Sequence, residues 1–189
     1  MKEILNKVPD KRIDKNTTSL KLKEDLIDFF KDKNLENCVE IGTSMGYSTY
    51  ILSHIFKNVV SIDIDMGNIQ NAMKFNSDRN NITFLYGDST ASEWDEDIKF
   101  DVSFIDADHS YDAVISDVKK SILHGKQGMY IAFDDYGLPE DRPCVKVAVD
   151  EMIANGTLKL IQYIGEPKDS EPRIGRPLID WEGIITQVC

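Results

Sequence analysis

A short stretch at residues 104–114, FIDADHSYDAV, gathers groups that could bind a cation or move a proton. Asp106, Asp108, His109 and Asp112 place three carboxylates and one imidazole within seven residues. They follow directly on an apolar run that is typical of a buried strand. Two interpretations are open at this point. The stretch is either a strand that ends in a solvated turn with a helix cap, or half of an active site.

Alternating strands and helices must position these groups. Apolar runs predict strands at 37–42, 58–65, 82–88, 100–108, 128–135, 158–165 and 181–188. Helical spacing of apolar residues predicts helices at about 17–34, 46–56, around 69–73, 111–122 and 143–155. This order predicts an α/β, Rossmann-like doubly wound fold. Its mostly parallel seven-stranded sheet has helices on both faces and an antiparallel C-terminal strand pair.

Composition restricts the classes of function. The 189 residues are 41% hydrophobic, which suits one domain at 17–189, preceded by a loose polar arm at 1–16. The net charge of −11 disfavours nucleic-acid partners. The sequence contains no run of 18 apolar residues, so no membrane span is expected, and no secretory signal is recognised. Three widely spaced cysteines argue against a disulfide scaffold or a zinc site and favour a reducing, cytoplasmic location.

Acidic residues recur at the carboxyl ends of the predicted strands, where open α/β sheets bind their ligands. They are Glu40, Asp63, Asp88, Asp106, Asp108, Asp134 and Asp135. One such acid is ordinary, but a series over five successive strands indicates a binding site.

A glycine loop between the first strand and its helix points to a nucleoside ligand. Gly42 and Gly46 permit a tight turn, and Asp63 lies 21 residues after Gly42, which suits an acid that bonds ribose hydroxyls. Ser44 stands where a dinucleotide fingerprint has its central glycine. The Glu40 carboxylate would repel a pyrophosphate and suits a ligand that carries an ammonium group. Both features disfavour a nicotinamide-dependent oxidoreductase.

Five motifs, VEIGTSMGYST, SIDID, YGDS, FIDADHSYD and IAFDDYG, together resemble the class I S-adenosylmethionine-dependent methyltransferases. The nearest resemblance is to the cation-dependent O-methyltransferases, which include catechol, caffeoyl-CoA and macrocin-type sugar enzymes. It covers residues 17–135 and implies S-adenosylmethionine and a divalent cation, Mg²⁺ or Mn²⁺, as cofactors.

The resemblance also assigns roles to residues. It implies a cation on Asp106, Asp134 and Asp135, whose neighbouring strands lie about 4.8 Å apart, and oxygen ligands suit Mg²⁺ or Mn²⁺. Such a cation chelates two adjacent hydroxyls of the acceptor. His109 takes the place of the catalytic base. The last two of these residues, Asp134 and Asp135, form an acidic pair, which favours the sugar branch over the catechol branch.

Further cofactor contacts are expected around the same edge. Tyr47 and Ser48 open a helix whose amides face the cofactor carboxylate. Asp88 and Ser89 are expected beside the adenine ring. Asp106 is also expected to bind the cofactor, and Asp108 belongs either to the cofactor's amino-acid end or to a helix cap. Asn16 to Ser19 offer caps for the first long helix, and Thr17, Thr18 and Ser19 are either such caps or cofactor contacts. Tyr111 is expected in the core. His54 and His124 are expected to take no part in catalysis.

The sequence therefore predicts a metal-dependent O-methyltransferase that acts on a small vicinal diol, most of all a sugar or glycan. Its expected partner is a small-molecule or glycan acceptor, with a homodimer left open. A catechol-type aromatic enzyme, a nicotinamide-dependent oxidoreductase and a non-catalytic nucleoside-binding module are the alternatives. The loop at 165–183, with Lys168, Arg173, Arg176 and Trp181, is either a lid that reads substrate or a plain surface loop.

Overall fold

The computed structural model describes residues 2–11, 14, 17–91, 94–95, 97–139, 144–171 and 177–189. Three residues named above, Asn16, Arg173 and Arg176, lie outside these ranges, as does Pro143 at the predicted start of the helix at 143–155. The helices are α1 (Lys2–Leu5), α2 (Leu20–Phe30), α3 (Tyr47–Ile55), α4 (Met66–Phe75), α5 (Tyr111–Leu123) and α6 (Val145–Ala154). The strands are β1 (Asn37–Ile41), β2 (Asn58–Asp63), β3 (Ile82–Tyr86), β4 (Phe100–Ile105), β5 (Gly125–Phe133), β6 (Leu158–Ile164) and β7 (Gly183–Val188).

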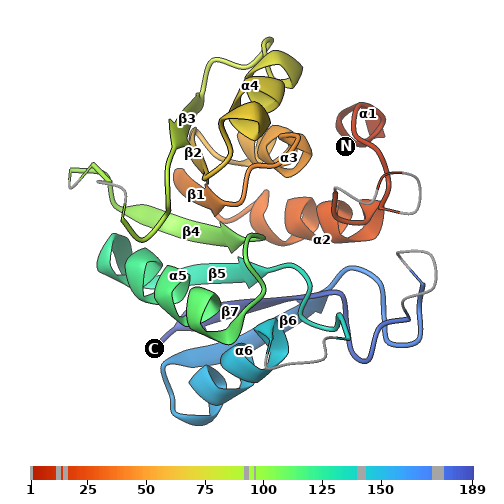
Figure 1. The fold of residues 1–189 in the computed structure, drawn as a ribbon, viewed down its shortest axis with the longest axis vertical. Helices are drawn as coiled ribbons and strands as arrows, with labels where there is room; N and C mark the ends of the chain where they lie inside the picture. The colour runs from red at the N-terminus through yellow and green to blue at the C-terminus, as the bar shows by residue number, and fades with distance from the viewer. Residues whose placement is uncertain are drawn as a thin grey trace.

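All seven strands form one sheet in the order β3-β2-β1-β4-β5-β7-β6 (Figure 1). Strands β1 to β5 are parallel to one another, and β7 runs antiparallel to both β5 and β6. This confirms the doubly wound sheet with its antiparallel C-terminal pair. The strand order reverses between β1 and β4, so the crevice for a ligand is expected beyond the carboxyl ends of these two strands.

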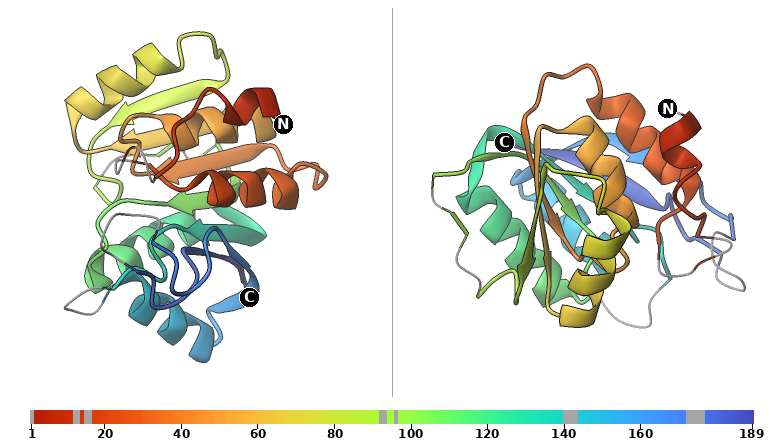
Figure 2. Two further views of the ribbon diagram at one scale, coloured as in Figure 1. Left: turned by 90° about the vertical axis from the view of Figure 1, so that its right-hand side faces the viewer. Right: turned by 90° about the horizontal axis from the view of Figure 1, so that it is seen from above.

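Helices cover both faces of the sheet, as Figure 2 shows from above. One face packs its apolar residues against α5 and α6, among them Val118 and Val149. The other packs against α2 and α3, among them Leu26 and Leu52. Strands that are covered on both faces have continuous apolar sequences, which is why β1 and β4 could be predicted from the sequence.

The predicted helix boundaries follow from local chemistry. Ser19 caps α2, because its hydroxyl accepts a hydrogen bond from the Leu22 amide at 3.0 Å. The chain leaves α6 at Asn155 and turns at Gly156, whose φ of 80° suits glycine. Strand β5 begins at Gly125, three residues before its predicted start, because Gly125 pairs with Phe100 ahead of a register shift.

The N-terminal arm is not loose where the structure describes it. Residues 2–5 form α1, which contacts α2 and α3. Val8 joins a small apolar cluster with Ile27 and Tyr50, and Lys11 is 2% exposed. The polar composition of this arm concealed two residues that are buried against the domain.

Two further observations concern sequence expectations. All three cysteines are unpaired: Cys38 and Cys144 are buried and Cys189 is exposed. Within the described ranges, no helix has both the length and the apolar character needed to cross a membrane.

Candidate functional site

A cavity of about 600 Å³ opens at the reversal of the strand order. Its walls come from the loops after β1, β2, β3 and β4 and from the first turns of α5. Seven of the ten residues predicted to bind the cofactor line it: Gly42, Ser44, Asp63, Asp88, Ser89, Asp106 and Asp108. The sheet edge therefore brings together side chains that are up to 66 positions apart in the sequence, from position 42 to position 108.

The glycine loop is held in place by Asp63. Its Oδ2 accepts hydrogen bonds from the backbone amides of Thr43 at 3.1 Å and Ser44 at 2.8 Å. Gly42 has a φ of 97°, and a side chain there would collide with the carbonyl oxygen of Asp106. Ser44 has a φ of 47°, so it adopts the left-handed conformation that glycine usually supplies. The loop thus keeps the glycine-type path of the backbone although its central residue is serine.

Glu40 does not line this cavity. Its side chain points to the face of β1 that α3 covers, and Ser61 and Thr49 donate their hydroxyls to its Oε2. The residue is fully buried, and its Oε1 has no hydrogen-bond partner within the described part of the chain. Burial is the main reason why the pKa of Glu40 is raised to about 8. The hydrogen bonds from the two hydroxyl groups lower this pKa, but they only partly offset the effect of burial. A neutral carboxyl behind the loop was not expected from the sequence, which indicated an anion facing the ligand.

Tyr47 and Ser48 also lie outside the cavity wall. Tyr47 stacks edge-on against Phe75 with ring centroids 4.8 Å apart, and Ser48 is buried in the first turn of α3. Gly46 precedes them with a φ of 76°. The side chains of both residues therefore pack within the protein, and any role toward a ligand is limited to the helix N-terminus.

The far wall of the cavity is acidic. Asp88 accepts hydrogen bonds from the amide and hydroxyl of Thr90 at 2.8 and 2.7 Å, which lower its pKa. Ser89 donates its hydroxyl to Asp117, a residue of α5 whose pKa burial raises. Asp108 accepts from the Ser110 amide at 2.8 Å, so it shapes the turn before α5 and lines the cavity as well.

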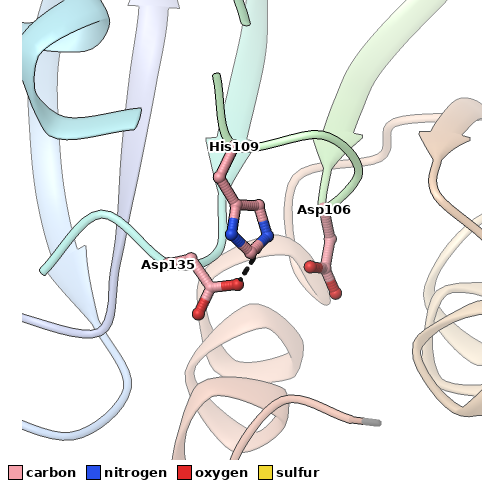
Figure 3. Close-up of side chains that lie close together, drawn as sticks. All are labelled: Asp106, His109 and Asp135. Atoms are coloured by element: carbon pink, nitrogen blue, oxygen red, sulfur yellow. Dashed lines mark ion pairs between the residues drawn. The ribbon is translucent and has the colours of Figure 1, made fainter. Parts of the chain in front are cut away.

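A second group of side chains adjoins this cavity. Asp106, His109 and Asp135 bring their ligand atoms within 4.8 Å of one another. Figure 3 shows the imidazole between the two carboxylates, which come from the ends of β4 and β5. His109 Nε2 lies 2.9 Å from Asp135 Oδ2, and this hydrogen bond is the main cause that raises the pKa of His109 to about 9. Asp135 has a φ of 55°, a strained conformation of the kind that clusters at functional sites.

Asp134, the third predicted cation ligand, turns to a different partner. Its Oδ2 lies 3.1 Å from the Lys11 ammonium, which also contacts Asp135 Oδ1 at 3.0 Å and Glu182 Oε1 at 3.3 Å. Burial raises the pKa of Asp134 well above its usual range, and the neighbouring Asp135 raises it further. Asp134 Oδ1 is buried and has no hydrogen-bond partner among the described residues.

Several residues of this region were missed by reasoning from the sequence. Glu182 is fully buried and accepts from the Ser19 amide at 2.9 Å and the Glu166 amide at 3.0 Å. Its place directly before a strand could have been noticed. Lys23 interrupts the apolar face of α2, which was a usable signal. Lys11 offered none, because a lysine in a polar arm is expected in solvent.

The other predictions have mixed outcomes. His54 and His124 lie at the ends of α3 and α5, away from the cavity, as expected. Tyr111 was expected in the core, but it is only half-buried and its hydroxyl donates to Glu151 at 2.7 Å. Thr17, Thr18 and Ser19 are buried but do not line the cavity, and of the three the structure shows Ser19 as a helix cap.

A family model and a viral protein match this chain over much of its length. Residues 39–136, just over half of the chain, match the family described as methyltransferase domain. The uncharacterized protein R132 of Acanthamoeba polyphaga mimivirus is 31% identical over 149 residues, and the match spans 70% of this chain and 65% of that protein.

Solved structures of methyltransferases share the fold. The N-methyltransferase NodS from Bradyrhizobium japonicum, in complex with S-adenosylhomocysteine, matches with a TM-score of 0.67 at 13% identity over 88% of this chain and 84% of that one. An O-methyltransferase from Bacillus cereus with the same ligand gives 0.63 at 20% identity over 88% and 79%. The amino pentose methyltransferase CalS10 from Micromonospora echinaspora gives 0.62 at 9% identity over 88% and 90%.

These matches decide between the enzyme classes that the sequence left open, because a methyltransferase domain covers both the glycine loop and the acidic pair. A nicotinamide-dependent oxidoreductase and a non-catalytic nucleoside-binding module are thereby set aside. The chain belongs to the methyltransferase domain family.

Proposed function

We propose that this chain transfers a methyl group from S-adenosylmethionine to a hydroxyl of a small vicinal-diol acceptor, most of all a sugar or glycan, with the help of a divalent cation. One observation carries the proposal. Asp106 belongs both to the wall of the large cavity and to the group with His109 and Asp135. A methyl donor in the cavity would therefore end beside groups that can hold and deprotonate a hydroxyl.

The cavity suits S-adenosylmethionine by size and chemistry. We assign Asp63, which already holds the glycine loop, to the ribose hydroxyls, and Asp88 and Ser89 to the adenine side. We assign Asp106 and Asp108 to the amino-acid end, where carboxylates suit an ammonium group. All five of these acidic or hydroxyl residues line the cavity. Structures of this fold from B. japonicum and B. cereus contain S-adenosylhomocysteine, the product of such a donor.

The acidic pair and Asp106 offer the type of ligand atom that a hard divalent cation prefers. Carboxylate oxygens suit Mg²⁺ or Mn²⁺, and Oδ1 of Asp134 is buried without a hydrogen-bond partner among the residues that the structure describes. We assign Asp106, Asp134 and Asp135 to this ion. When bound, a divalent cation would chelate two adjacent hydroxyls and lower the pKa of one of them.

His109 is the proposed base. Its imidazole is about 29% exposed, and Asp135 fixes its orientation through the bond to Nε2. The base must be neutral to accept a proton, and Asp135 holds the pKa of His109 near 9 in this arrangement. We therefore expect the rate of methyl transfer to rise with pH as the imidazolium loses its proton. The deprotonated hydroxyl attacks the sulfonium methyl group in line, and alignment in the cavity supplies much of the acceleration.

A catechol-type aromatic acceptor is the second candidate. The rings of Tyr163 and Trp181 are stacked with centroids 6.3 Å apart and an angle of 15°. They lie at the end of β6 and before β7, at the edge of the sheet that also carries Asp135. A partly exposed aromatic pair can contact an aromatic ring as well as the apolar face of a sugar.

Two measurements test the proposal. Calorimetric titration with S-adenosylhomocysteine should show binding, and its absence would refute the cofactor assignment. A screen of sugar and catechol acceptors with labelled methyl donor, in Mg²⁺, Mn²⁺ or EDTA, should show transfer that EDTA abolishes. Full activity in EDTA would contradict the cation assignment, and activity on catechols alone would favour the second candidate.

A further inference from the structure

The ammonium group of Lys11 lies on the same carboxylates that we assign to the cation. It contacts Asp134 Oδ2 at 3.1 Å, Asp135 Oδ1 at 3.0 Å and Glu182 Oε1 at 3.3 Å, and the side chain has no exposed surface. Since His109 occupies the other oxygen of Asp135, both of its oxygens are engaged. An ion entering this position would meet the positive charge of Lys11 at contact distance.

The segment that carries Lys11 is attached to the domain by apolar packing, by polar contacts and by the ion pairs of Lys11. Lys23 of α2 donates to the carbonyl oxygen of Pro9 at 2.9 Å, and Val8 packs into a small apolar cluster. Further out, the ammonium of Lys7 pairs with Asp78 at 2.8 Å on the surface, where ion pairs contribute little. In residues 2–11, the N-terminal segment, the ion pairs of Lys11 are thus a fully buried polar anchor, beside the apolar packing of α1 and Val8.

Charge balance makes Lys11 and a divalent cation alternatives. Without an ion, the buried carboxyl groups of Asp134, Asp135 and Glu182 leave negative charge that needs compensation, because an unpaired buried charge is costly. Lys11 supplies one positive charge at contact distance from all three. With an ion on Asp134 and Asp135, like charges at this separation in a buried site repel strongly, and Lys11 loses its contacts with both of these carboxylates.

We propose that Lys11 is a tethered competitor of the cation: it holds the acidic pair in the ion-free protein, and cation binding displaces its ammonium and loosens the N-terminal segment. The inference rests on the proposed cation site. Its consequence is a protein whose N-terminal segment reports whether the site is loaded. The segment also limits the affinity for the ion, because the pair must first be vacated.

Mn²⁺ binding to the full chain tests this, followed by calorimetry and by electron paramagnetic resonance of the free ion. If Lys11 occupies the pair for 90–99% of the time, Lys11→Met should bind Mn²⁺ about 10- to 100-fold more tightly than the wild type. Lys7→Met is the matched control, since it removes a lysine of the same segment that contacts no site carboxylate in the described structure. Its affinity should equal that of the wild type.

Hydrogen exchange of the wild type gives a second measurement that needs no variant. The amides of Asn6, Lys7 and Val8 are bonded to carbonyls within the segment. Saturating Mn²⁺ should accelerate their exchange, because the segment loses its buried anchor. If Lys11→Met does not fold, this measurement decides alone: faster exchange supports the competition, and unchanged or slower exchange refutes it.

The remaining outcomes separate this inference from the proposed function. Equal Mn²⁺ affinity of the wild type and Lys11→Met would overturn the competition and leave the cation site standing. An absence of Mn²⁺ binding to both proteins, with methyl transfer that survives EDTA, would overturn the competition and the cation assignment together. If Lys7→Met also binds Mn²⁺ more tightly than the wild type, the gain comes from loosening the segment in general, and the specific role of Lys11 is refuted.

Discussion

Glu40→Gln is expected to stabilise the protein in a pH-dependent manner. The Glu40 side chain is fully buried, and its pKa is raised from an ordinary 4.5 to about 8, mainly by burial. Below pH 4.5 the carboxyl is neutral in both the folded and the unfolded chain, so no free energy is lost. As the pH rises above 4.5, the unfolded chain ionises while the folded one stays neutral, and stability falls until the pH passes about 8.

The size of the effect follows from the two pKa values. Each pKa unit corresponds to about 1.4 kcal/mol, so at pH 7 protonating Glu40 on folding costs about 3 kcal/mol, and at pH 5 about 1 kcal/mol. Glutamine has the same shape, and its carbonyl can accept from Ser61 and Thr49 as Oε2 does. The stability gained by the variant over the wild type should therefore grow by roughly 2–3 kcal/mol between pH 5 and pH 7.

Urea unfolding of both proteins at pH 5, 6 and 7, without cofactor, measures this difference. Glu36→Gln is the matched control, because Glu36 is exposed and its pair with Lys57 lowers its pKa. That variant should show no gain in stability as the pH rises. A Glu40→Gln gain that stays constant from pH 5 to pH 7 would refute the reasoning, since it would mean that Glu40 is ionised in the folded protein.

Three further changes test the site. Asp63→Ala removes the acceptor of the amide bond from Ser44 and the proposed ribose contact. It should weaken S-adenosylhomocysteine binding by about 10- to 100-fold in calorimetry, at about 1.4 kcal/mol per factor of ten, and unchanged affinity would contradict the cofactor pose. His109→Ala should lower turnover by about 10²–10⁴-fold with nearly unchanged cofactor affinity, whereas His54→Ala should leave turnover unchanged; equal turnover of both variants would exclude the base role. Gly42→Ala should lower the melting temperature and abolish cofactor binding, because its φ of 97° and the adjacent carbonyl leave no room for a side chain; a stable variant that binds would show that the loop can shift.

Much of the fold was available from local patterns. The apolar runs of β1 and β4 mark strands that are buried on both faces, and the spacing of Val114 and Val118 marks the helix α5 between two parallel strands. Parallel strands bring their carboxyl ends to one edge. The sequence therefore also predicted that Asp63 and Asp106 would meet, and both line the same cavity.

The sequence by itself determined the order of the elements and the edge at which the acidic groups gather, because periodicity and strand direction are local properties. Only the tertiary structure decided how each charge is compensated. It placed Glu40 behind the loop in an environment that keeps it neutral. It also paired His109 with Asp135 and brought Lys11 onto Asp134, 123 residues away in the chain. Such pairings depend on packing between distant segments and on the cost of unpaired buried charge, and neither leaves a periodic trace in the sequence.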